Sequence, residues 1–140
     1  MNTLRAALAP GFIAGVISIF TSWLWMGVIF HPHQKATPAT WRPEGGRSYF
    51  FAGVLHLFAA IAIACLFTLV VRFNVGVFGT GIAGSVCFAI CIWGAIAAPV
   101  VIEAAIFINL HPLVVIGQLF DWLSTSLVAC LVTGWWLGPR

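Results

Sequence analysis

Two long apolar runs, residues 81–108 and 113–137, most constrain what this chain can fold into. They are separated only by Asn109-Leu110-His111-Pro112, where a proline follows polar, turn-prone residues and ends a helix. Each run is longer than the ~20 residues that a helix needs to cross the apolar core of a bilayer. We therefore predict two neighbouring antiparallel transmembrane helices that meet at this hinge.

Two further apolar runs, residues 6–30 and 49–71, precede this pair. The segment between them, residues 31–48, is polar and contains three prolines and a Gly-Gly pair, which argues against a regular helix. The pattern predicts an all-α fold, an integral membrane four-helix bundle in up-down-up-down order. We expect residues 1–140 to form this single domain, with both termini on one side of the membrane.

The composition supports lipid as the main solvent of the chain. Of the 140 residues, 62% are hydrophobic and 6% are charged, whereas about a quarter of a soluble domain is charged. The net charge of +3 comes from scattered bases without a basic run, so nucleic acid is not an expected partner. The positive-inside rule leaves the orientation open, because three bases fall on each expected side: Arg5, Arg72 and Arg140 against Lys35, Arg42 and Arg47.

Small residues recur at helical spacing in the apolar runs. In lipid such residues let helix backbones approach and pack closely. We expect helix packing at Gly11, Gly15, Ser18, Ser22, Gly84, Ala95 and Gly117. These positions, and the lack of a catalytic motif, favour a non-enzymatic structural or accessory membrane subunit. Such a subunit would associate with the bilayer and form a homo-oligomer or join a larger membrane complex.

The ionisable residues of the apolar runs suggest a different function. Counted at ~1.5 Å per residue from the side of the first and third loops, His56, Glu103 and Asp121 lie roughly 10 to 16 Å deep. Ionisable groups inside a membrane usually face a bundle interior or a water-filled cavity. We expect a polar pocket formed by His56, Glu103, Asp121 and Ser124. The alternative function is therefore a small carrier or proton-coupled permeation unit that uses Glu103, Asp121 and His56.

The same residues also allow less specific interpretations. Each acid can simply be satisfied by neighbouring polar groups and hold helices together, because interhelical polar bonds in lipid contribute ~0.6 to 2 kcal/mol. Four histidines are expected on the side of the first and third loops, and they could bind a haem or a metal: His31, His33, His56 and His111. A haem- or quinone-binding subunit is therefore the second alternative. No known metal-ligand spacing is present, so we predict no metal and no cofactor. The four cysteines have no CxxC spacing and are expected to pack as small apolar residues.

Two aromatic-glycine patterns carry a family resemblance. They are Trp23-x-Trp25-Met26-Gly27-x-x-Phe30 at the end of the first run and Ile92-Trp93-Gly94 in the third. In these patterns the chain resembles a family of small four-helix bacterial membrane proteins catalogued as a domain of unknown function. The resemblance implies the four-helix architecture and a place in the bacterial cytoplasmic membrane. It implies no activity.

Overall fold

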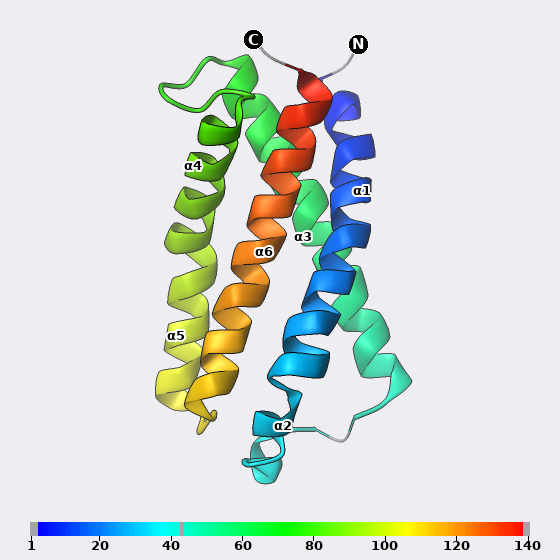
Figure 1. Cartoon of the computed structure of the whole chain (residues 1–140), viewed down its shortest axis with the longest axis vertical. Coiled ribbons are helices and arrows are strands. Elements are labelled where there is room, and N and C mark those ends of the chain that lie inside the picture. Colours follow the sequence, from blue (N-terminus) through cyan, green and yellow to red (C-terminus); the bar gives the residue numbers. More distant parts are fainter. Residues whose placement is uncertain (1–2, 43, 139–140) are drawn as a thin grey trace.

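The computed structural model describes residues 3–42 and 44–138, and within these residues all regular elements are helices. Four of the helical stretches are long and apolar enough to cross a membrane: Arg5–Ile29, Gly46–Arg72, Ile82–Phe107 and Pro112–Leu137. Figure 1 shows them lying alongside one another as a helical bundle. The apolar pattern of the sequence thus produces four long helices, close to the expected ranges.

The first and third stretches each contain a π-helical segment. In the first, α1 (Thr3–Ser22) continues into η1 (Trp23–Ile29). In the third, α4 (Ile82–Ile92) continues through η3 (Trp93–Ala97) into α5 (Ala98–Phe107). Proline has no backbone N–H, and its ring clashes with the carbonyl of the residue four before it. The wider turn of η3 contains Ala95, the residue four before Pro99, so the proline is accommodated within one continuous helical stretch.

The polar segment between the first two stretches holds short helical turns. They are α2 (His31–Gln34) and the 3-10 turn η2 (Pro38–Thr40). The next helix, α3 (Gly46–Arg72), begins three residues earlier than the expected residue 49, directly after the extended Gly45. The Thr40 hydroxyl donates a hydrogen bond to the Asn109 carbonyl at 3.1 Å, so this loop lies against the connection between α5 and α6.

The last helix, α6 (Pro112–Leu137), packs against α1, α3 and α4. Its start follows from the sequence, because Pro112 lies in the first turn and the His111 ring accepts a hydrogen bond from the Leu113 N–H at 3.2 Å. Near its other end, an apolar cluster fills the bundle: Phe67, Val71, Phe88, Ala89 and Cys130. This half of the bundle, next to the connection after Arg72, is packed mainly by apolar side chains, with the hydroxyls of Thr68, Ser85 and Thr133 buried among them.

Small residues of α1 bring that helix close to α3. A Cβ atom added to Gly11 would lie 2.9 Å from the Ile61 Cα, and one added to Gly15 would lie 2.9 Å from the Leu57 Cα. The buried small residues of α1 therefore pack within the chain. Of the other predicted packing positions, Ser18, Gly84 and Gly117 are buried, Ser22 is half-buried and Ala95 is exposed.

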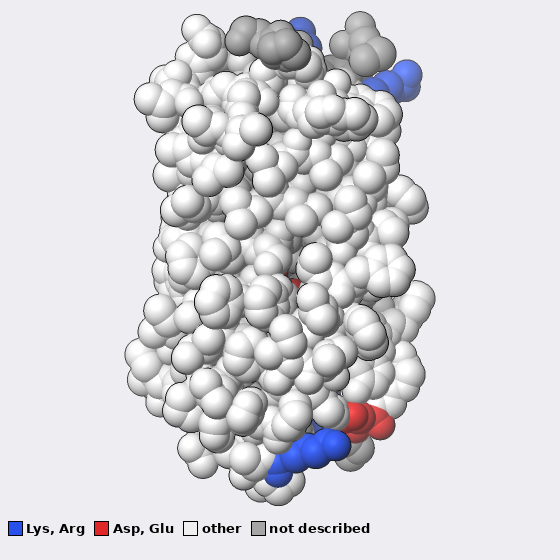
Figure 2. All heavy atoms as spheres, in the orientation of Figure 1, with Lys and Arg blue, Asp and Glu red and all other residues white. Residues whose placement is uncertain are grey.

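Charged side chains gather at the two ends of the molecule. On the face shown in Figure 2, Lys and Arg atoms lie at both ends and Asp and Glu atoms lie mainly at the lower end, and the surface between the ends is almost uncharged. The exposed side chains along the described helices include large apolar residues such as Phe20, Phe58, Val100 and Ile106. An exposed belt of this kind is what a membrane-spanning bundle presents to lipid.

Candidate functional site

A cluster of three polar side chains, two of them buried, joins three helices. The Asp121 Oδ2 atom of α6 lies 3.1 Å from the His56 Nε2 atom of α3. The same oxygen accepts a hydrogen bond from the Ser22 hydroxyl, at the end of α1, at 3.0 Å. Asp121 and His56 meet because each lies nine or ten residues from the start of its helix, ~14 to 15 Å along the axis from the same end of the bundle. Both side chains are buried, with 4% and 7% of their residues' surface exposed.

The hydrogen bonds of the imidazole define where protons must lie. The His56 Nδ1 atom lies 2.9 Å from the Ala52 carbonyl oxygen, which can only accept, so Nδ1 carries a proton. The contact between Nε2 and the Asp121 carboxyl then needs one more proton, on either the imidazole or the carboxyl. With this proton the pair is neutral, and without it the pair carries one negative charge. The pair therefore holds one exchangeable proton.

The surroundings of the pair leave one carboxyl oxygen without a partner and hold the imidazole in place. The second Asp121 oxygen, Oδ1, is buried and has no hydrogen-bond partner among the described residues. An ionised carboxylate with an unpaired oxygen in an apolar interior is costly. The Trp122 ring stacks on the His56 ring, with centroids 5.0 Å apart and planes 12° apart, and fixes its orientation.

Two tryptophans anchor the π-helical segments on α6. The Trp25 indole donates to the Ser124 hydroxyl at 2.9 Å, and that hydroxyl donates to the Phe120 carbonyl at 2.8 Å. The Trp93 indole donates to the Leu119 carbonyl at 3.0 Å. Ser124, predicted as part of the polar pocket, thus lies one turn from Asp121 but bonds to η1 rather than to the acid.

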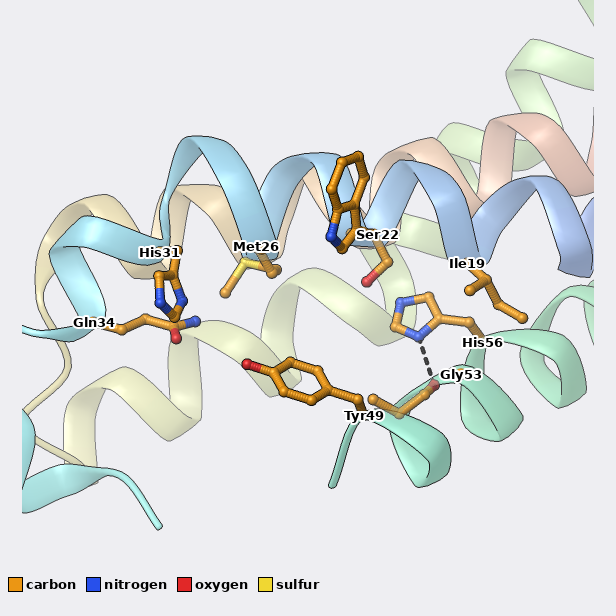
Figure 3. Close-up of a pocket in the computed structure, with 11 residues that line it drawn as sticks. Ile19, Ser22, Met26, His31, Gln34, Tyr49, Gly53 and His56 are labelled. Atoms are coloured by element: carbon orange, nitrogen blue, oxygen red, sulfur yellow. Dashed lines mark hydrogen bonds between the residues drawn. The ribbon is translucent and has the colours of Figure 1, made fainter. Parts of the chain in front are cut away.

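A cavity leads from the end of the bundle to this cluster. Its volume is about 460 Å³, and it lies between α1–η1 and α3. Figure 3 shows Ser22, His56 and Ile19 around one end, with His31 and Gln34 at the other and Tyr49 between them. Among its lining residues Tyr49 is 57% exposed, so the cavity is open beside the start of α3. The two direct partners of Asp121 therefore form part of its inner wall.

A second acid, Glu44, lies next to the outer end of the cavity. It accepts a hydrogen bond from the Tyr49 hydroxyl at 2.9 Å, and its other oxygen lies 3.6 Å from the His31 Nε2 atom. The outer cluster thus repeats the inner one in chemistry, with a carboxyl, an imidazole and a hydroxyl in each. In both clusters the imidazole and the hydroxyl line the cavity.

The remaining predicted residues lie elsewhere. Glu103 is exposed on α5 and makes no hydrogen bond or ion pair with any residue that the structure describes, so it does not join His56 and Asp121. The rings of His33 and His111 stack at the end of the bundle, with centroids 5.1 Å apart. Within residues 3–42 and 44–138, no three His, Cys, Asp or Glu side chains are grouped so that they could hold a metal ion.

Sequence reasoning missed Ser22 as a partner of Asp121 and missed the outer cluster of Glu44, His31 and Tyr49. One signal for the inner pair is present in the sequence. The pattern Ala-Cys-Leu-x-Thr at residues 64–68 recurs 65 residues later at 129–133. His56 and Asp121 are also 65 residues apart, so each lies eight residues before this shared pattern in its helix.

Comparisons of the chain with protein-family models, curated proteins and solved structures gave no match. The resemblance to a family of small four-helix membrane proteins therefore stays an expectation from Trp23–Phe30 and residues 92–94.

Proposed function

We propose that the chain is an integral membrane protein of four antiparallel helices, in up-down-up-down order, that acts as a small carrier or proton-coupled permeation unit. The His56–Asp121 pair takes up and releases the coupling proton. The observation that supports this proposal is the buried pair, whose hydrogen bonds require one exchangeable proton, at the inner wall of a cavity. Ionisable groups in a membrane-spanning bundle commonly mark such proton sites. The proposal assigns no enzymatic reaction to the chain.

The packing on either side of the pair supports a carrier rather than an open pore. The cavity reaches His56 from one end, while beyond it Ala14, Ala60 and Ala129 close the space between the helices. A carrier exposes its site to one side of the membrane at a time. Release to the other side requires that this small-residue layer separate.

A proton-flux measurement tests the proposal. The purified protein is reconstituted into liposomes that contain a pH-sensitive dye, and a potassium gradient with valinomycin makes the interior negative. We expect inward proton flux above that of empty liposomes, lost in Asp121→Asn and retained in Glu103→Gln, because Glu103 lies outside the cluster. Equal flux in the wild type and Asp121→Asn, or no wild-type flux at all, would overturn the proposal.

An oligomerising accessory subunit is the second candidate function. It is favoured by the exposed Glu103 on an otherwise apolar helix, since an acid facing lipid gains from a covering partner. In this case Ala95, also exposed, would lie at a contact between copies in a bacterial cytoplasmic membrane. Chemical cross-linking in native membranes tests it, and a strictly monomeric protein would exclude self-association.

A further inference from the structure

No Lys, Arg, Asp or Glu lines the cavity beside α1–η1, but the imidazole and hydroxyl at each of its ends contact a carboxyl, Asp121 at the inner end and Glu44 at the outer end. From this arrangement we propose that the cavity binds an amphipathic organic cation, such as an alkylated or aromatic amine. The inference rests on the proposed carrier function and names the class of molecule that exchanges with the proton.

The electrostatics of the inner cluster favour a positive ligand. When the His56–Asp121 pair releases its proton, it leaves one negative charge in a buried site, and such a charge is costly unless it is compensated. A cation held against His56 and Ser22 compensates it. At the outer end, the Glu44 carboxyl attracts the same cation as it enters. An anion would approach a carboxyl at both ends and is therefore disfavoured.

The hydrogen-bonding groups at the inner end also fit an amine. Both ring nitrogens of His56 are already engaged, and the Ser22 hydroxyl donates to Asp121. What remains toward the cavity is the acceptor capacity of the Ser22 oxygen, which suits an N–H donor.

The walls of the cavity provide the apolar part of the site. Ile19 and Met26 line one side, and the aromatic rings of Trp23 and Tyr49 also face it. Aromatic faces attract organic cations by ~0.5 to 2 kcal/mol. The volume of about 460 Å³ falls within the range of small-molecule sites. The site therefore combines an apolar lining with two carboxyls held directly behind it, Asp121 and Glu44, which matches a hydrophobic cation.

Tetraphenylphosphonium and tetraphenylborate, which have the same shape and opposite charge, are suitable probes. We measure their binding to the detergent-purified protein by equilibrium dialysis, with protein-free micelles as the reference. We expect saturable binding of the phosphonium alone, with proton release into weakly buffered solution as it binds. Saturable binding of both probes to similar extents, or of neither, would overturn the inference.

Matched variants locate the site. Asp121→Asn and Glu44→Gln should each weaken phosphonium binding by about tenfold, because each removes a charge near the cavity. Glu103→Gln should leave it unchanged, since this acid is exposed on α5, away from the lining. Tryptophan fluorescence during heating checks that each variant is folded. If Asp121→Asn does not fold, Glu44→Gln decides, because this residue is exposed. Unchanged affinity in the deciding variant would refute the inference.

Failure of the cation-binding inference can be distinguished from failure of the proposed carrier function. Proton flux that depends on Asp121 without phosphonium binding would overturn the inference and keep the carrier proposal. Phosphonium binding without proton flux would overturn the carrier proposal and leave an organic-cation binding protein.

Discussion

At the residue scale, the central feature is a single oxygen, the Asp121 Oδ2 atom, shared by an imidazole and a hydroxyl from two other helices. This atom therefore affects both the charge of the site and the packing of the helices. The same contacts that position the exchangeable proton also connect α1, α3 and α6. A substitution at residue 121 can therefore separate the two roles, according to whether it keeps the hydrogen bonds or removes them.

The free energy of unfolding of Asp121→Asn should lie within about 1 kcal/mol of the wild-type value, because an Asn NH2 group in place of the Oδ2 atom can donate to both the His56 Nε2 atom and the Ser22 oxygen. Asp121→Leu has similar size but leaves His56 and Ser22 without a partner, so a loss of ~1 to 3 kcal/mol is expected. Unfolding in detergent, followed by tryptophan fluorescence, measures both. Equal stability of the two variants would show that these hydrogen bonds do not hold the helices together.

At the element scale, the long helices were predictable because an apolar run of this length is a local property of the sequence. The side of the helix on which each residue lies was not predictable in the same way. Depth alone places Glu103 with Asp121, yet Glu103 is exposed on α5, beyond a π-helical segment that changes the angle between successive residues. The position of η3 depends on Pro99 and on the Trp93 contact with α6, and the latter is a tertiary interaction.

The approach of α1 to α3 yields a prediction for this pair of elements. Gly15→Ala should destabilise the bundle by ~1 to 3 kcal/mol, because its Cβ would lie 2.9 Å from the Leu57 Cα and the helices must separate. Gly53→Ala, on α3, is the control, since its Cβ would meet Ile19 at 3.8 Å, an ordinary contact. Unfolding of both variants is compared in the same detergent. A Gly15→Ala protein as stable as Gly53→Ala would show that close approach of these helices is not required.

At the scale of the whole molecule, the bundle has two unlike halves. Toward the connection after Arg72, apolar side chains pack around Phe67 and Cys130. Toward α2, the space between α1–η1 and α3 is a cavity lined by His56 and Tyr49. The buried imidazole–carboxyl pair thus borders the cavity in the half next to the first loop, whereas the other half buries hydroxyl side chains such as Thr68, Ser85 and Thr133. This polarity along the axis makes the topology testable, because the two ends must face opposite sides of the membrane in the proposed arrangement.

Single cysteines introduced into a background with the four native cysteines changed to alanine test that arrangement. Ala39 and Asn109 are exposed and lie in neighbouring segments at one end, while Val77 is 77% exposed in the connection after α3. A charged maleimide that does not cross membranes should label Ala39→Cys and Asn109→Cys from one side of sealed vesicles, and Val77→Cys only from the other. Apolar spans of this length cannot expose both connections to one side without leaving a helix uninserted. Labelling of Ala39→Cys and Val77→Cys from the same side would therefore rule out four membrane-crossing helices in alternating directions, and with them the one-sided access of the cavity to His56.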